Sequence, residues 1–343
     1  MRKRILYFDV LNVMACFAVV IMHFNGLVHS FSPTSDWLES LVAECLFYWA
    51  VPVFFMLSGA NLLAYRKRYS TKVFLIKRFE KTVVPFLGWS IIALFWKLVT
   101  NQISGPIGPR TFFNLLLNTQ IIDVYWFFIP LFSIYLSIPV LSYLCDGNHD
   151  RILEYSVFIG FIFISVLPSL CDFIGINYNS ALTLPVVGGN LIFVILGYLL
   201  ANHELTFNQR VSIYLAGIFG FIVRYSSTAY FSFAQGSLYQ VFWGLTNFPC
   251  VLLSVAVFVF CKYFKWERIF TTDSSCKLLR TLSSCSFGVY LIHMILFYYL
   301  LLITGLDGGR LIWRTAFPFI CYFICVLIVL VLKKVPFIKK LVP

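Results

Sequence analysis

The chain has 343 residues, of which 60% are hydrophobic and only 12% are charged, and its mean hydropathy is +0.88. This composition excludes a soluble globular domain, and the apolar runs that recur along the whole length indicate a polytopic helical membrane protein. Because the runs are continuous, an outer-membrane barrel is also excluded, since its strands alternate apolar and polar residues over short segments.

The hydropathy pattern predicts an all-α bundle of about ten transmembrane helices. They cover roughly residues 7 to 28, 41 to 64, 82 to 100, 124 to 144, 153 to 171, 184 to 201, 209 to 223, 238 to 261, 286 to 304 and 311 to 332. The seventh run is the shortest, because its fifteen residues barely cross about 30 Å of hydrocarbon.

The formal net charge of +12 is explained by where the basic residues lie. With the N-terminus inside, all but five of the 26 lysines and arginines fall in cytoplasmic segments; the five are Lys97, Arg110, Arg224, Arg310 and Arg314. This is the positive-inside distribution. It predicts that both termini are cytoplasmic, and a nucleic-acid partner is not needed to account for the charge.

The first apolar run, Tyr7 to Val28, carries three polar residues and is too long and too polar on one side for a cleaved signal peptide. At about 3.6 residues per turn, Asp9, Asn12 and His23 fall on one stripe of a helix, and Asp9 and His23 lie about 21 Å apart along its axis. Because a charge in hydrocarbon costs a few kcal/mol or more, this stripe is predicted to face protein or a water-filled cavity. The imidazole of His23 suits proton transfer near neutral pH, although a hydrogen bond to a neighbouring helix explains it equally.

Two features follow in the next spans. In the second span, Pro52 can loosen the helix, while Ser58 and Gly59 allow close backbone approach or serve as a simple packing patch. The inner loop that follows is strongly basic, and Arg78 lies at the mouth of the third span, where a guanidinium can hold a phosphate. The positive-inside rule explains the same loop without a ligand.

Two more features lie further along the chain. Trp126 opens the fourth span, as a cavity residue or as part of an interfacial aromatic belt, and His293 is a second intramembrane histidine, in the ninth span. No HxxxH spacing occurs, so no metal site is predicted. The ten cysteines lie mostly in apolar runs without CxxC pairs, which is typical of buried small hydrophobic residues.

Taken in chain order, five segments resemble the acyltransferase family 3 membrane proteins, bacterial enzymes that O-acylate cell-surface carbohydrates. The segments are YFDVLN…H at 7 to 23, PVFFMLSG at 52 to 59, KRFEKTVVPF at 77 to 86, YWFFIPL at 125 to 131 and GVYLIH at 288 to 293. Members of this family usually have arginine or lysine eleven residues before the first-span histidine, where this chain has Asn12. Asn12 still donates hydrogen bonds, and we interpret the change as variation within one branch of the family.

The resemblance implies a single transmembrane domain over residues 1 to 343, with no appended soluble domain, in a bacterial plasma membrane. It further implies transfer of an acyl group, acetyl first, from cytoplasmic acyl-CoA to a hydroxyl of a surface glycan or its lipid-linked precursor. Acyl-CoA is then a substrate, and no permanently bound cofactor is expected. His23 is expected to act as general base or to carry the acyl group, since the sequence is compatible with either role.

The other candidate residues take supporting roles in this interpretation. Asp9 is expected to orient the inner end of the path and Arg78 to pair with a CoA phosphate, while Ser58, Trp126 and His293 form cavity wall. Two other function classes stay open. A transporter or flippase for a lipid-linked sugar would use Asp9 and His23 as a proton relay, and a membrane sensor with a degenerate site would accommodate Asn12.

Overall fold

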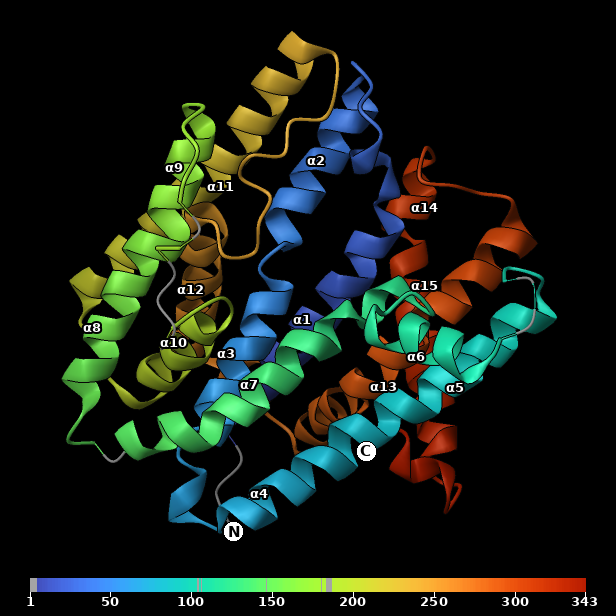
Figure 1. Cartoon of the computed structure of the whole chain (residues 1–343), viewed down its shortest axis with the longest axis horizontal. Coiled ribbons are helices and arrows are strands. Elements are labelled where there is room, and N and C mark those ends of the chain that lie inside the picture. Colours follow the sequence, from blue (N-terminus) through green and yellow to red (C-terminus); the bar gives the residue numbers. More distant parts are fainter. Residues whose placement is uncertain (1–4, 104, 106, 146, 180, 183–186) are drawn as a thin grey trace.

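The computed structural model describes residues 5–343 except 104, 106, 146, 180 and 183–186, and within that part of the chain every regular element is a helix. Among the described residues, seven helical stretches are long and apolar enough to cross a membrane, and three shorter apolar helices accompany them. The predicted all-α polytopic membrane bundle is therefore confirmed (Figure 1).

The first half of the chain forms most of the helices that line the candidate site. They are α1 (Leu6–Phe24), α2 (Ser35–Phe47), α3 (Ala50–Leu62), α4 (Thr71–Arg78), the π-helical turn η3 (Phe79–Val83), α5 (Val84–Val99), α6 (Pro109–Leu117), the 3-10 turn η4 (Asp123–Phe127) and α7 (Phe128–Leu141). The second half contributes α8 (Asp150–Gly160), the π-helical turn η6 (Phe161–Val166), α9 (Leu167–Phe173), α10 (Leu191–Asn202), α11 (Phe207–Gln235), α12 (Phe248–Tyr263), α13 (Asp273–Thr304), α14 (Leu311–Thr315), α15 (Phe317–Leu332) and the 3-10 turn η8 (Ile338–Lys340).

The seventh span differs most from its prediction. The fifteen residues expected at 209 to 223 are part of a 29-residue helix, α11, which begins at a capping box between Thr206 and Gln209 and ends at the left-handed Gly236. The polar residues beyond position 223 resembled a loop in the sequence, but Arg224 and Thr228 point into the protein and are buried. A helix in lipid tolerates polar groups that face its neighbours, so the helix continues.

Other spans also have different bounds than predicted; the eighth, expected from residue 238, begins at Phe248. The second span is broken at Tyr48 and Trp49, because Pro52 has no N–H to donate to the carbonyl four residues earlier. The ninth span begins at Asp273 rather than 286, since Thr272 caps the backbone N–H of Ser275 and starts the helix thirteen residues earlier.

Helix α1 lies between the two largest hydrophobic clusters of the bundle. Leu11 and Ala15 pack with α3, α7, α10 and α12 in one cluster. Cys16 and Val20 pack with α5, η4, α13 and α15 in the other. Every side of α1 therefore meets protein, which is what its polar stripe requires.

The tightest helix contact joins α3 to α10. A Cβ at Gly59 would overlap the carbonyl oxygen of Val194, and a Cβ at Gly197 would overlap that of Met56. The two glycines let the backbones touch, as small residues do in membrane helix pairs. The packing interpretation of Gly59 is thus confirmed.

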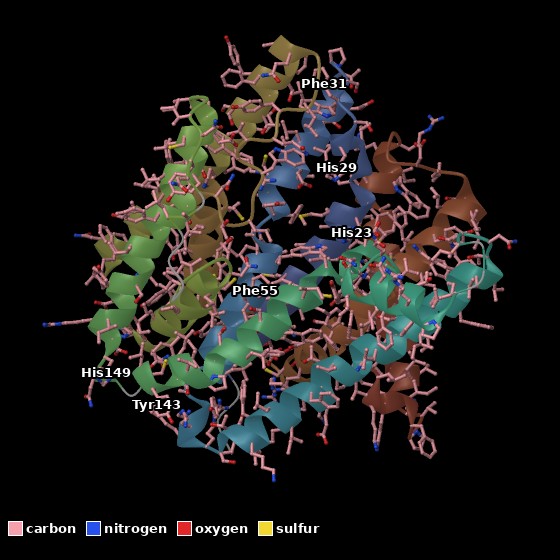
Figure 2. The ribbon with its side chains drawn as sticks, viewed as in Figure 1. His23, His29, Phe31, Phe55, Tyr143 and His149 are labelled. Carbon is pink, nitrogen blue, oxygen red and sulfur yellow. The ribbon has the colours of Figure 1, made fainter. Side chains whose placement is uncertain are left out.

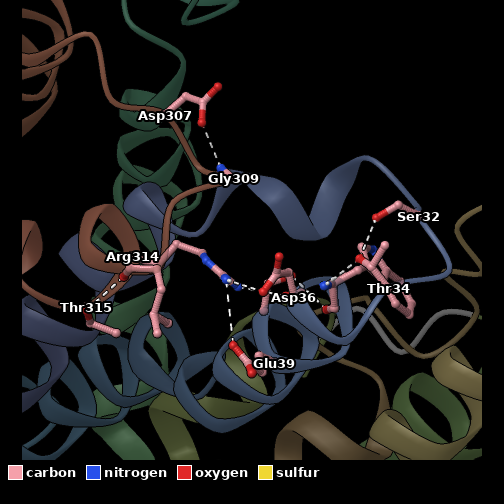
Figure 3. Close-up of polar contacts among 11 residues, drawn as sticks. Ser32, Thr34, Asp36, Glu39, Asp307, Gly309, Arg314 and Thr315 are labelled. Carbon is pink, nitrogen blue, oxygen red and sulfur yellow. Dashed lines mark hydrogen bonds and ion pairs between the residues drawn. The ribbon is translucent and has the colours of Figure 1, made fainter.

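Arg314 fastens α14 to the start of α2 (Figure 3). Its Nη1 donates to the carbonyl oxygen of Asp36 at 2.7 Å, and its Nη2 lies 3.7 Å from carboxylate oxygens of Asp36 and Glu39. Arg314 is buried although both carboxylates are largely exposed. The sequence analysis assigned Arg314 only to the outer side, and the structure shows that it locks two helices together.

Candidate active site

A cavity of about 670 Å³ opens in the bundle between α1, α3, η3, α7 and α13. Its lining includes Ile5 and Pro343, which lie at opposite ends of the described chain. Both therefore lie at the same end of the bundle, as the predicted even number of spans requires. This volume is typical of a site for a small molecule.

One mouth of the cavity is basic. Arg78, Lys81 and Thr82 come from the junction of α4 and η3, where three residues spaced by three and four share one helix face. The guanidinium of Arg78 lies 5.7 Å from the ring centre of Tyr135, and its Nε is buried without a hydrogen-bond partner among the described residues. A cation with an unused donor is prepared for an anionic group of a ligand.

The α1 wall carries the predicted polar stripe. Asp9 and Asn12 line the cavity together with Val19 further along the helix. The side-chain amide of Asn12 donates to the carbonyl oxygen of Ser283 at 2.8 Å and contacts its hydroxyl at 3.1 Å. Asn12 therefore ties α1 to α13 at the middle of the cavity, and it is a neutral group that already has partners.

The α3 wall faces Asn12 across the cavity. Ser58 lines it, and its hydroxyl donates to the carbonyl oxygen of Phe54 at 3.0 Å, which leaves the oxygen lone pairs free to accept. Asn61 lies on the same face, three residues on, and the sequence reasoning missed it. The three-residue spacing from Ser58, which places both side chains on one helix face, was the signal that could have identified Asn61.

Further lining residues on α13 were also missed. Ser283, Ser284 and Ser286 form a polar edge, and the prediction that the span begins at 286 hid the first two. Tyr290 closes the cavity above them, where its hydroxyl donates to the carbonyl oxygen of Val124.

The two intramembrane histidines meet beyond the cavity. The ring centres of His23 and His293 lie 5.1 Å apart, although 270 residues separate them in sequence. His23 lies four residues past Val19, or about 6 Å along the helix, so the cavity ends one turn short of it. Figure 2 shows His23 on the same side as His29 and Phe31, whereas Tyr143 and His149 lie at the opposite end.

The hydrogen bonds of His293 fix its tautomer. Nδ1 lies 2.7 Å from the carbonyl oxygen of Tyr290 and 3.1 Å from that of Val289, and carbonyls only accept, so Nδ1 carries the proton. In the neutral ring Nε2 then keeps its lone pair. Nε2 is buried with no hydrogen-bond partner among the described residues, which leaves an acceptor beside His23.

Trp126 lies outside this arrangement. It is 39% exposed, while its neighbours Tyr125 and Phe127 are buried. The hydroxyl of Tyr125 donates to the carbonyl oxygen of Leu291 at 2.8 Å and holds η4 against α13. The structure thus brings Asp9, Asn12, Ser58 and Arg78 to one cavity and places His23 with His293 beyond it. Their roles in transfer stay predictions.

A buried ion pair lies in the same half of the bundle as His23. Arg224 Nη2 is 3.5 Å from Glu44 Oε1, both side chains are at most 5% exposed, and the guanidinium carbon lies 3.5 Å from the ring centre of Tyr48. The prediction that Arg224 belongs to an outer segment is therefore wrong, because it lies within α11. No local signal identified its partner, which is 180 residues away.

One of three comparisons with known proteins identifies a family. No curated protein and no solved structure significantly matches the chain. The model of the acyltransferase family 3 domain, described as an acyltransferase domain, matches residues 5–334, which is nearly the whole chain and contains every element of the cavity except its last lining residue, Pro343. The chain is a multi-pass membrane protein of acyltransferase family 3.

Proposed function

We propose that the protein transfers an acyl group, acetyl in the first instance, from acyl-CoA to a hydroxyl of a surface glycan or its lipid-linked precursor in a bacterial plasma membrane. One observation carries the proposal. The cavity begins at Arg78 and Lys81, follows the polar stripe of α1 and ends one helical turn before His23. A path with a cationic entrance and an imidazole beyond its closed end suits an anionic donor whose acyl group must travel inward.

The donor would enter at the basic mouth, which is predicted to be cytoplasmic. Arg78 would pair with a phosphate of CoA, because its Nε has no partner among the described residues and a guanidinium binds phosphate in two-pronged geometry. Asp9 would orient the inner end of the path, and Ser58 and Asn12 would line the way of the acyl chain. CoA acts here as a substrate, not as a resident cofactor.

His23 would perform the chemistry in one of two ways. As general base it takes the proton of the sugar hydroxyl while the new carbon–oxygen bond forms, the carbon–sulfur bond breaks and the proton passes to the thiolate. As acyl carrier its nitrogen attacks the thioester carbonyl, the carbon–sulfur bond breaks and CoA leaves as the thiolate. The sugar oxygen then displaces the imidazole, and the hydroxyl proton passes to the thiolate. In both cases His293, with Nε2 unprotonated, offers a second acceptor beside the reacting ring.

The test compares radiolabel passing from acetyl-CoA to glycan in membranes that contain the wild type, His23→Ala or His149→Ala. We expect His23→Ala to lose about 10²- to 10⁴-fold of the rate, the usual contribution of a general acid–base group. His149→Ala is the matched control, because this exposed histidine lies at the opposite end of the bundle. Normal transfer by a correctly inserted His23→Ala protein would refute the mechanism.

The transporter alternative gains from the same pair of histidines, since rings 5.1 Å apart could pass a proton. It predicts flux of a lipid-linked sugar that depends on the proton gradient and ignores acyl-CoA. The sensor alternative predicts no turnover, and in that case Asn12→Arg would restore some transfer by supplying the usual cation. Labelled glycan from the wild type would exclude both alternatives.

A further inference from the structure

A second cavity, of about 660 Å³, lies beside the basic mouth of the first. We call it the lysine cavity, because its lining contains four lysines and only one acidic residue. The lining is Glu80, Lys81, Val84, Lys333, Lys339, Lys340, Val342 and Pro343. The positive-inside rule explains why lysines lie at this end of the bundle. It does not explain why residues from three separate segments converge on one hollow.

Ordered contacts build this hollow. The indole N–H of Trp89 on α5 donates to the carbonyl oxygen of Leu341 at 3.0 Å, and the side chain of Val342 is fully buried. The tail after α15 is therefore docked on the bundle, and η8 presents Lys339 and Lys340 from a fixed turn. Opposite them, Lys333 Nζ donates to the carbonyl oxygen of Ser284 at 2.6 Å.

The lysine cavity borders the main cavity. Lys81 and Pro343 line both, and Ser284, which holds Lys333, lines the main one. A ligand can therefore place one group among the lysines while another part of it lies along α1. The walls between the lysines include the apolar Val84 and Val342, and Lys81, Lys339 and Lys340 are exposed, so their ammonium groups are accessible to a ligand.

We infer that the lysine cavity binds a phosphate monoester, and that Arg78 is not the sole phosphate contact of this protein. The inference rests on the proposed function for one of two possible sources, the 3′-phosphate of acyl-CoA. In that case Arg78 in the main cavity would meet the diphosphate of the donor and the lysines would meet the 3′-phosphate. The other source is the headgroup of an acidic membrane lipid, which basic hollows at the cytoplasmic side also accept.

The test measures binding, so it is independent of turnover. The purified chain in phosphatidylcholine nanodiscs is titrated with adenosine 3′,5′-bisphosphate and, separately, with adenosine 5′-monophosphate. Lys339→Gln/Lys340→Gln is expected to weaken bisphosphate binding roughly tenfold, the effect of losing about 1.4 kcal/mol, and to change monophosphate binding much less. The matched control, Lys72→Gln/Lys277→Gln, removes the same charge from exposed lysines outside the cavity and should bind like the wild type.

A second arm distinguishes the two sources. The same proteins are placed in discs that contain phosphatidic acid, and their thermal stability is compared with that in neutral discs. Stabilisation that requires Lys339 and Lys340, without bisphosphate binding, would assign the phosphate to a lipid. If neither bisphosphate binding nor lipid stabilisation differed between the tail variant and the control, the inference would be overturned. Failure of the proposed function would appear separately, as absence of labelled glycan from the wild type.

Discussion

The two halves of the proposed transfer path are built differently. The half with Arg78 is hollow and lined by polar groups with spare hydrogen-bonding capacity. In the half with His23, the ring centres of His23 and His293 lie 5.1 Å apart, and the buried Glu44 and Arg224 pack together with the half-buried Tyr48. His23 lines neither of the two described cavities. Under the proposed function, the donor side is therefore a preformed cavity, whereas neither described cavity reaches His23, where the acceptor would react.

The largest effect of a substitution on stability is expected in the half with His23. Arg224→Met leaves the buried Glu44 carboxylate without its partner, and breaking a buried pair costs about 3–5 kcal/mol. Thermal unfolding in detergent would measure the loss. Glu44→Leu combined with Arg224→Met removes both charges, so most of the stability should return.

Arg314→Met is the variant with which Arg224→Met should be compared. Arg314 is buried to a similar degree, but its carboxylate partners are 60% and 56% exposed and keep their hydration when the arginine is lost. We expect a clearly smaller loss than for Arg224→Met. Equal losses of stability in the two variants would mean that the contribution of Arg224 comes from burial of the arginine side chain and not from its pairing with the buried Glu44.

In the hollow half the expected effect is on donor binding rather than on folding. Arg78→Gln should raise the KM for acyl-CoA about 10- to 100-fold, since a charge-assisted hydrogen bond contributes about 1.5–3 kcal/mol, and leave kcat and thermal stability close to wild type. Initial rates over a range of donor concentrations measure this. Arg280→Gln, at an exposed position on the first turns of α13, is the matched control. A fall in kcat at unchanged KM would place Arg78 outside the donor site.

Substitutions in the middle of the proposed path, at Asn12 and Ser283, are expected to change stability only slightly. Asn12→Ala removes the two contacts to Ser283 and should cost about 1 kcal/mol of stability. Ser283→Ala keeps its backbone carbonyl, so Asn12 retains its 2.8 Å bond and the loss should be smaller. Additive losses in the double variant would show that the two residues do not act on each other.

The sequence predicted the half with Arg78 better than the half with His23. The stripe of Asp9 and Asn12 follows from helical periodicity, and Ser58 and Arg78 lie in segments that resemble the family. All four line one cavity. Contacts between distant parts of the chain, such as Glu44 with Arg224 or Trp89 with the tail, have no local signal, because each depends on how whole helices pack.

The length of α11 was missed for a related physical reason. Polar residues such as Arg224 and Thr228 usually end a membrane span, and only their burial against α2 and the 236–247 segment allows the helix to continue. Trp126 shows the opposite case. It lies within a segment that resembles the family, yet it is 39% exposed and does not line the cavity. Resemblance located the segment and not the direction of each side chain.

The smallest predicted effect lies outside the membrane spans, at the loop between α10 and α11. Hydrogen bonds from Tyr263 at 2.8 Å and from Lys262 lower the pKa of Glu204 below its usual value. Since the folded protein favours the ionised carboxylate, this contribution to stability is present above the unfolded pKa of about 4.3 and is lost as pH falls through the lower folded value. Glu204 is 80% exposed, so solvent screening keeps the effect small.

Glu204→Gln tests this pH dependence. The variant should unfold at a slightly lower temperature than the wild type at pH 7, and the difference should vanish in acid, where the wild-type carboxyl is protonated as well. Glu267→Gln, in the next loop on the same predicted side, serves as the control for loss of one exposed carboxylate. A difference that persisted unchanged in acid would trace the effect to the shape of the side chain, because at that pH neither protein carries the charge.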